Sequence, residues 1–346
     1  MSLNRFFHKT YPSLDWIQVE VSSYCNAACI YCPHAAYKNN WQNRFLPVEV
    51  FKGLIPAFKK TKLVYLQGWG EPFTHPLFFD MLQLAKKAGC MVGTTTNGTL
   101  IDQKSIDRMV NERLDIIGFS LAGVDEKNDS IRKGTHIKKV LDCMEKINAA
   151  KSKYGVDYPE IHVAYMLLRS GLNDLEKLSA FLGNSGADET VISSLSLVVS
   201  PAMDPESVLA SGEDGYVALR RRLLEAKEAS EKQGAAVYFH IVSPLLEESK
   251  CSENISRAIV VGSDGSISSC VMTQIPVVGE NFYYFKGQMQ RLQKLTFGNL
   301  YYDWLNDVWH RKVYRKFIRT GLRGGIPNVC QNCYKRYIDK LEKNIY

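Results

Sequence analysis

The chain has 346 residues, of which 45% are hydrophobic and 23% charged, and its formal net charge is +7. This composition is typical of a globular protein, and the length fits one large domain plus a smaller one. The first twelve residues hold no apolar core and no stretch approaches 18 consecutive apolar residues, so we expect neither a signal peptide nor a membrane span. Nine cysteines are an odd number for a disulfide framework, and we therefore expect a cytoplasmic protein whose clustered thiols bind metal.

Most of the positive charge lies near the C-terminus. Residues 311–346 contain ten Lys or Arg and two acidic residues, a net charge of +8, so the rest of the chain carries −1. We favour the interpretation that this segment is the solvated face of a helix, as basic runs usually are. The alternative is a docking face for an acidic protein or an anionic substrate.

The first predicted strand leads into a cysteine-rich loop. Residues 16–22 alternate apolar and polar side chains, which is the pattern of a half-buried strand. The loop that follows holds Cys25, Cys29 and Cys32, spaced C-x3-C-x2-C, with Tyr31 directly before the last of them. Thiolates are soft ligands that suit iron–sulfur clusters or zinc. Three thiolates without a nearby fourth leave one coordination position open, which is typical of catalytic rather than structural metal sites.

Strands and helices alternate after this loop. We expect further strands at 63–66, 91–95, 115–121, 161–168 and 190–199. We expect helices from about residue 47, from 76 to 89, from 102 to 111, from 137 to 153 and from 173 to 182. This alternation predicts an α/β fold, a parallel sheet with right-handed crossovers that rolls into a partial (β/α)6 TIM-like barrel. Chemistry in such folds lies at the carboxyl ends of the strands.

Polar and glycine-rich loops fall at these predicted strand ends. Besides the cysteine loop, they contribute Gly68, Trp69, Gly70, Glu71, Thr96, Asn97, Ser120 and, shortly downstream, Arg132. Gly68 and Gly70 carry no Cβ and let a ligand approach the backbone, while Glu71 offers a carboxylate to an ammonium group. Arg132 suits a ligand carboxylate because its guanidinium binds in bidentate fashion. Each feature alone is weak, but their order on successive strand ends predicts one shared site.

A second group of cysteines follows in the last third of the chain. Residues 200–212 are read as a linker, and a helix is expected at 214–233. Apolar runs at 258–261 and 266–270 flank Gly-Ser-Asp-Gly, which predicts a β-hairpin. The cysteines of this region are Cys251, Cys270, Cys330 and Cys333. We expect the two other cysteines, Cys90 and Cys143, in the core.

The loop at Cys25, Cys29, Tyr31 and Cys32 resembles the C-x3-C-x-aromatic-C signature of the radical S-adenosylmethionine (SAM) superfamily. The resemblance implies that the three cysteines hold a [4Fe–4S] cluster and that SAM chelates its fourth iron. One electron from the cluster then cleaves SAM to methionine and a 5′-deoxyadenosyl radical, which abstracts a substrate hydrogen. A structural zinc knuckle is the alternative, and we favour it far less because zinc sites usually show two cysteine pairs.

The same resemblance assigns roles to the strand-end loops. The run from Gly68 to Glu71 is similar to the family's GGEP motif, which receives the SAM amino group, although Trp69 splits the usual glycine pair. Ser120 and Arg132 match a pattern that holds the SAM ribose and carboxylate. Thr96 and Asn97 lie where the family contacts the ribose or the substrate. Tyr31 is counted with the SAM-binding residues.

The second cysteine group resembles the SPASM auxiliary-cluster motif of radical SAM enzymes. Cys251, Gly265 and Cys270 follow its C-x13-G-x4-C spacing. No cysteine follows Cys333, so the region is similar to the shortened version called twitch, with one auxiliary [4Fe–4S] cluster. The resemblance implies that Cys251, Cys270, Cys330 and Cys333 hold this cluster, and four thiolates complete its ligation. The ligand set alone fits a zinc ion as well. We therefore expect a radical SAM barrel at 14–235 and a twitch/SPASM-like domain at 236–346.

The resemblance as a whole implies an enzyme that uses SAM and two [4Fe–4S] clusters. The cysteine layout is most similar to that of the 2-deoxy-scyllo-inosamine dehydrogenases, so we favour oxidation of a small hydroxylated substrate, with the auxiliary cluster accepting the second electron. The alternatives are a maturase that modifies a peptide, a protein or a metallo-cofactor, and a non-catalytic protein with two structural metal sites. We expect an electron donor such as flavodoxin or ferredoxin as partner, and neither a membrane nor a nucleic acid.

Overall fold

The computed structural model describes residues 11–246 and 251–340. A sheet of eleven strands forms the centre of this described part. Its strands are β1 (Leu14–Val19), β3 (Thr61–Tyr65), β4 (Met91–Thr96), β5 (Ile116–Leu121), β7 (Glu160–Leu167), β8 (Glu189–Ser194), β9 (Ala236–Val242), β10 (Ala258–Val261), β11 (Ser266–Ser268), β14 (Gly298–Asn299) and β15 (Ile338–Asp339). The spatial order is β14-β11-β10-β1-β3-β4-β5-β7-β8-β9-β15. From β10 to β9 all neighbours pair in parallel, whereas β11, β14 and β15 join the two edges antiparallel.

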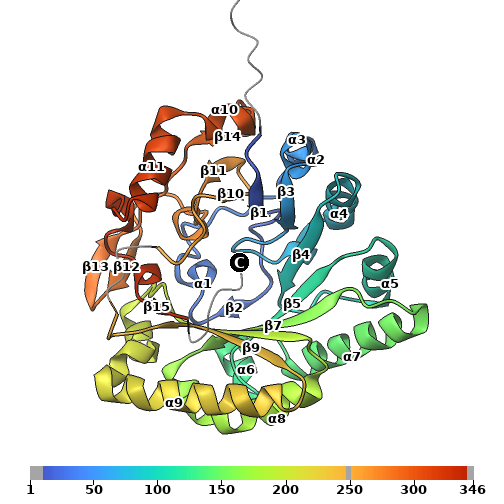
Figure 1. The fold of residues 1–346 in the computed structure, drawn as a ribbon, viewed down its shortest axis with the longest axis vertical. Coiled ribbons are helices and arrows are strands. Elements are labelled where there is room, and N and C mark those ends of the chain that lie inside the picture. Colours follow the sequence, from blue (N-terminus) through green and yellow to red (C-terminus); the bar gives the residue numbers. More distant parts are fainter. Residues whose placement is uncertain (1–10, 247–250, 341–346) are drawn as a thin grey trace, which may run out of the picture.

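Helices cover the outer side of this sheet. The helices of the described chain are α1 (Pro33–Ala36), α2 (Val48–Lys52), α3 (Ile55–Phe58), α4 (Phe78–Lys87), α5 (Gln103–Asn111), α6 (Lys127–Ile131), α7 (Ile137–Tyr154), α8 (Leu175–Ser185), α9 (Gly212–Glu231), α10 (Leu305–Trp309) and α11 (Lys312–Leu322). Figure 1 shows the strands curving around an open centre, with α4, α5, α7, α8 and α9 outside them. This arrangement is the predicted partial barrel. No helix in the described ranges is both long and apolar enough to cross a membrane.

Two small sheets complete the fold. One pairs β2 (Ala28–Cys29) with β6 (Arg132–Lys133), and the other pairs β12 (Phe282–Phe285) with β13 (Gln288–Arg291). Figure 1 shows β2 and α1 over the open centre of the main sheet. The cysteine loop is therefore folded over the carboxyl ends of the parallel strands.

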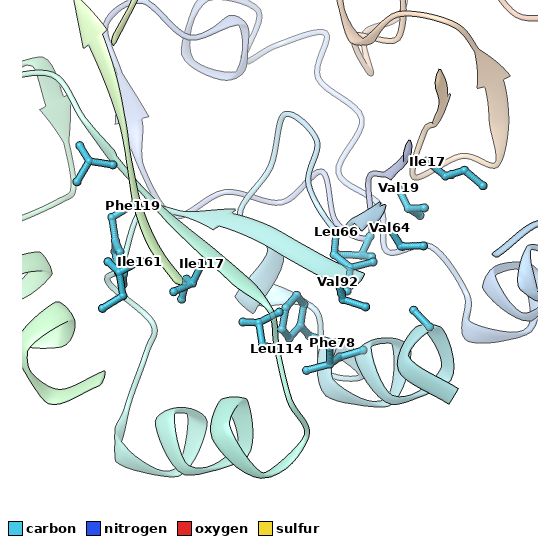
Figure 2. Packing of buried hydrophobic residues seen from close by; sticks show 14 of the residues in the cluster. Ile17, Val19, Val64, Leu66, Phe78, Val92, Leu114, Ile117, Phe119 and Ile161 are labelled. Atoms are coloured by element: carbon cyan, nitrogen blue, oxygen red, sulfur yellow. The ribbon is translucent and has the colours of Figure 1, made fainter. Parts of the chain in front are cut away.

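The core lies between the strands and the outer helices. Ile17, Val64, Val92, Ile117 and Phe119 come from four neighbouring strands and are fully buried there. Figure 2 shows these side chains along the strands, with Phe78 of α4 among them. Because every second residue of a strand faces this layer, the alternate residues face the interior of the barrel, where the site lies.

Most predicted elements agree with the structure, with four differences. The strand expected at 190–199 ends at Ser194, and strand β9 at Ala236–Val242 was not predicted. The helix expected from residue 47 is two short helices, α2 and α3, because Pro56 in the first turn of α3 would interrupt a continuous helix. The linker prediction for 200–212 was wrong. That segment forms the 3-10 helices η3 (Pro201–Glu206) and η4 (Val208–Ser211), and its side chains Met203 and Val208 are buried in the core.

The main sheet runs across the expected domain boundary at 235/236, which remains a prediction. Strands β9 and β10 both follow that boundary, yet β9 pairs with β8 and β10 pairs with β1. The predicted hairpin exists as β10 and β11. Because β10 lies beside β1, the hairpin that leads to Cys270 lies next to the strand that leads to the first cysteine loop.

Candidate active site and auxiliary cluster site

A pocket at the carboxyl ends of the parallel strands brings the predicted residues together. Its volume of about 320 Å³ is that of a small-molecule site. Its lining contains the three cysteines of the first motif and all the other residues expected there, namely Cys25, Cys29, Cys32, Tyr31, Gly68, Trp69, Gly70, Glu71, Thr96, Asn97, Ser120 and Arg132. Residues spread over more than a hundred positions of sequence therefore share one cavity.

The cysteine loop is held against the segment that carries Arg132. Strand β2 pairs antiparallel with β6, which places Cys29 opposite Arg132. Gly134 makes the tight turn after β6 possible with a φ of +89°, and a Cβ there would lie 3.0 Å from the carbonyl oxygen of Asn26. The local pairing thus fixes both the thiols and the guanidinium in the same wall of the pocket.

Arg132 is a buried cation with an unused donor. Its side chain is 6% exposed, and its Nη1 donates a hydrogen bond to the Tyr31 hydroxyl. Its Nε has no hydrogen-bond partner among the described residues, although it is buried. A buried donor without a partner is costly, so this atom points to a ligand acceptor such as a carboxylate.

Burial dominates the electrostatics of the first cysteine group. Burial, with a smaller contribution from neighbouring thiols, raises the pKa of the Cys25 thiol to about 11 and that of the Cys32 thiol to about 12. The protein alone therefore keeps these thiols protonated at neutral pH. Binding of a metal cluster by these thiols would release those protons.

Glu71 has a role that the sequence did not predict. Its carboxylate is 2% exposed and accepts hydrogen bonds from the Thr96 hydroxyl at 2.7 Å, the Asn97 main-chain N–H at 2.7 Å and the Phe73 N–H at 3.2 Å. The Asn97 side chain in turn donates to the side-chain oxygen of Asn26 at 2.8 Å. Glu71, Thr96 and Asn97 therefore form one hydrogen-bonded unit that ties two strand-end loops to the cysteine loop.

Part of the pocket wall was missed from the sequence. β7 and β8 contribute Ala164, Tyr165, Met166, Val191 and Ser193 to the lining. Ala164 and Met166 belong to the half-buried, alternate set of β7 residues, whose neighbours Val163 and Leu167 are fully buried. Strand alternation was the available signal, because it places these residues on the inner face.

A second cavity contains the other cysteine group. It has a volume of about 240 Å³, and its lining includes Cys251, Cys270, Cys330 and Cys333. Burial raises the thiol pKa of Cys251 to about 11 and that of Cys330 to about 12, and the neighbouring thiols raise both. The ion pair between Lys335 and Glu253, 2.8 Å long, lies beside these thiols. Cys251 precedes β10, and Cys270 follows β11. Cys330 and Cys333 lie close together near the C-terminus.

The cysteine groups are compatible with cluster ligation. Among the described residues, no three Cys, His, Asp or Glu side chains converge closely enough to hold one metal ion. A [4Fe–4S] cluster binds each cysteine at a different iron, so its ligands lie further apart than the ligands of a single ion. The grouping of four thiols around one cavity is compatible with such a cluster.

Two family models match this chain. Residues 19–180 match the radical SAM superfamily, and residues 251–334 match SPASM, an iron–sulfur cluster-binding domain. The chain therefore belongs to the radical SAM superfamily and carries a C-terminal SPASM domain. It is a radical SAM enzyme whose cofactors are SAM and two [4Fe–4S] clusters.

Similar proteins include one relative that matches over most of its length. It is the tungsten-containing aldehyde ferredoxin oxidoreductase cofactor-modifying protein of Pyrococcus furiosus, 23% identical over 332 residues, which are 93% of this chain and 88% of that protein. Streptococcus suis SuiB bound to S-adenosylmethionine superposes with a TM-score of 0.67 at 16% identity, over 95% of this chain and 72% of SuiB. BtrN in complex with AdoMet and 2-DOIA superposes with a TM-score of 0.51 at 16% identity, over 92% of each chain. At these identities the two structures show a shared fold.

Proposed function

We propose that this enzyme abstracts a hydrogen atom from a metal-cofactor precursor and thereby acts as a cofactor maturase. The observation that supports this substrate class is the similarity, over nearly the whole chain, to a cofactor-modifying protein. The pocket supports the SAM chemistry, because it gathers three thiols, a buried guanidinium and two glycines in one cavity. When bound, SAM and the catalytic cluster supply the 5′-deoxyadenosyl radical.

The chain's own residues bind and orient these cofactors. Cys25, Cys29 and Cys32 are the ligands of the catalytic cluster. Arg132 receives the SAM carboxylate through its unused Nε, and the Tyr31 hydroxyl holds the guanidinium in place by accepting from Nη1. The remaining predicted residues form the SAM pocket, namely Gly68, Trp69, Gly70, Glu71, Thr96, Asn97 and Ser120. The half-buried residues of β7 and β8 line the side of the pocket where a substrate would lie.

The auxiliary site has no ligand position left for a substrate. Cys251, Cys270, Cys330 and Cys333 supply four thiolates, which is full ligation of one [4Fe–4S] cluster. This cluster carries electrons. The charged pair of Lys335 and Glu253 beside the thiols is suited to adjusting its potential.

Electrons reach the protein from a small acidic donor such as flavodoxin or ferredoxin. Helix α11 supports this proposal because its outer face exposes a row of basic side chains, Lys312, Arg315, Lys316, Arg319 and Arg323. No ion pair involves these five side chains within residues 251–340 or the rest of the described chain. The opposite face of the same helix places Phe317 and Gly321 in the wall of the auxiliary cavity. A donor docked on α11 would lie over the auxiliary site.

Oxidation of a small hydroxylated substrate is the second candidate function. It is favoured by the fully ligated auxiliary site, which can take an electron from a substrate radical, and by the shared fold with a protein bound to 2-DOIA. In this reaction a substrate C–H hydrogen atom goes to the 5′-deoxyadenosyl radical. The hydroxyl oxygen of the resulting carbon radical then loses its proton, one electron passes to the auxiliary site, and a ketone forms.

One experiment distinguishes the two functions. The reconstituted enzyme is given SAM and dithionite without oxygen, together with a tungsten-cofactor precursor, 2-deoxy-scyllo-inosamine or a peptide. The maturase proposal expects the formation of 5′-deoxyadenosine to rise with the cofactor precursor alone. A rise with the aminocyclitol alone, accompanied by its ketone, would replace the proposal by the dehydrogenase. Failure of the iron-loaded enzyme to form 5′-deoxyadenosine under any condition would contradict both.

A further inference from the structure

A buried carboxylate lies between the SAM pocket and the auxiliary hairpin. Glu20 directly follows β1, which pairs with β3 on one side and with β10 on the other. One of its oxygens accepts a hydrogen bond from the Trp69 main-chain N–H at 2.8 Å. The other accepts from the Ser263 N–H at 3.1 Å and from the Ser263 hydroxyl at 2.7 Å. Glu20 thus joins a loop of the SAM pocket to the turn between β10 and β11.

The Trp69 side chain makes a second connection between the same two regions. Its indole Nε1 donates a hydrogen bond to the carbonyl oxygen of Val271 at 3.1 Å. Val271 directly follows Cys270, one of the four cysteines of the auxiliary cavity. Trp69, a residue of the SAM pocket, therefore has its side chain hydrogen-bonded to the residue that follows an auxiliary cysteine.

The loop that carries Trp69 is packed tightly on both sides. A Cβ on Gly68 would lie 2.2 Å from Cγ of Glu20. A Cβ on Gly70 would lie 2.4 Å from the carbonyl oxygen of Ser22, on the segment that leads to the first cysteine loop. Because close-packed groups transmit small displacements instead of absorbing them, a shift of the hairpin reaches the SAM pocket through this loop.

The Glu20 carboxylate gives this connection its rigidity. The side chain is 3% exposed, and the hydrogen bonds that it accepts come from neutral donors of Trp69 and Ser263. A buried carboxylate needs these donors, because their hydrogen bonds offset the free energy lost when the carboxylate leaves water. Neither the Trp69 loop nor the β10–β11 turn can therefore move away from Glu20 cheaply.

We infer that Glu20 and Trp69 are positioning residues that couple SAM binding at the catalytic cluster to the redox state of the auxiliary cluster. The inference rests on the proposed function, since it takes SAM and both clusters to occupy these two cavities. Reduction of the auxiliary cluster changes the charge at Cys270, and the adjacent Val271 carbonyl passes the resulting shift to Trp69. By thermodynamic linkage, two free energies are equal. One is the change in SAM binding caused by reduction of the auxiliary cluster, and the other is the change in reduction of that cluster caused by SAM binding.

Three variants isolate this connection. Trp69→Phe keeps an aromatic ring and removes the indole N–H that reaches Val271. Ser263→Ala removes one donor to Glu20 without changing the SAM pocket itself. Trp309→Phe is the matched control, because it makes the same replacement at the buried Trp309 in α10, against Tyr314, and has no part in the SAM pocket. Melting temperature and iron content establish that each variant is folded and loaded.

The test measures the midpoint potential of the auxiliary cluster by EPR-monitored titration, with and without SAM, and the dissociation constant of SAM. We expect SAM to shift the potential in the wild-type protein and in Trp309→Phe, and to shift it much less in Trp69→Phe and Ser263→Ala. We also expect the SAM dissociation constant to rise about 2- to 10-fold in Trp69→Phe, as for the loss of one hydrogen bond.

The outcomes separate this inference from the function on which it rests. An equal shift in Trp69→Phe and in the wild type, or no shift in a wild type that binds and cleaves SAM, would overturn the coupling alone. A wild-type protein that carries both clusters but binds no SAM would instead overturn the proposed function.

Discussion

The replacement Arg132→Lys tests the assignment of the SAM carboxylate to a single side chain. Lysine keeps the positive charge in the pocket but presents a point charge instead of a planar, bidentate donor. In the structure, Nη1 of Arg132 is committed to Tyr31 and Nε is buried without a partner. A bound carboxylate is therefore expected to accept one charge-assisted hydrogen bond from Nε. A lysine ammonium group at this position cannot donate that bond and also keep the hydrogen bond to Tyr31.

The expected magnitude follows from that one bond. A hydrogen bond to a charged group contributes about 1.5–3 kcal/mol, which corresponds to a rise of roughly 10- to 150-fold in the dissociation constant of SAM. The assay is a SAM titration of the anaerobically reconstituted protein, followed by the EPR spectrum of the reduced catalytic cluster. Arg108→Lys on the outer helix α5 is the matched control, because Arg108 pairs with Glu112 far from the pocket.

The reasoning would be refuted by a simple result. If Arg132→Lys holds both clusters and binds SAM within about threefold of the wild type, Arg132 does not bind the carboxylate. An unchanged dissociation constant together with a loss of iron would assign Arg132 to the cluster site instead.

Three further predictions address the auxiliary site, the basic helix and one helix cap. Cys330→Ala should lose about half of the bound iron, as expected for loss of one of two equal clusters, and should keep the SAM-dependent change in the EPR spectrum of the other; loss of all iron would contradict separate sites. The double replacement Lys316→Glu and Arg319→Glu should slow turnover driven by flavodoxin, with a weaker dependence on salt, and leave turnover driven by dithionite unchanged; equal loss with both reductants would reject the docking face. Asp102→Ala should lower the free energy of unfolding by about 0.5–2 kcal/mol at neutral pH, because Asp102 caps α5 by accepting from the Ser105 N–H. Hydrogen bonds from the Ser105 hydroxyl and the Ser105 N–H hold the pKa of Asp102 below its usual value. The stabilisation is therefore present above the unfolded pKa and disappears as the pH falls through the folded pKa. Thermal unfolding of the wild type, Asp102→Ala and Asp102→Asn across that pH range checks this. If the stability difference between the wild type and Asp102→Ala stays unchanged in acid, the charged Asp102 does not act as the cap.

Local sequence patterns predicted the elements and the gathering of the site. Two features of the site can be read from short stretches of sequence. One is the spacing of Cys25, Cys29 and Cys32, and the other is the position of Glu71 and Ser120 at the ends of predicted strands. Strand ends that follow one another in a parallel sheet must meet at one edge. The pocket that contains these residues is the geometric consequence.

Long-range contacts were not predictable in the same way. The pairing of β10 with β1 joins residues more than two hundred positions apart, and no local pattern specifies it. The hydrogen bonds of Glu71 to Thr96 and Asn97 depend on which of several polar loops come to lie side by side. The segment at 200–212 reads as a linker because of its prolines and polar residues, whereas two of its apolar side chains find room in the core.

The central claim is that Cys25, Cys29 and Cys32 hold a redox-active cluster on which SAM is cleaved. The most direct test is EPR and Mössbauer spectroscopy on the reduced, iron-loaded Cys330→Ala variant, in which the catalytic cluster is the one retained. Addition of SAM should change the spectrum of that cluster and yield 5′-deoxyadenosine. A spectrum that SAM leaves unchanged, with no 5′-deoxyadenosine formed, would contradict the account.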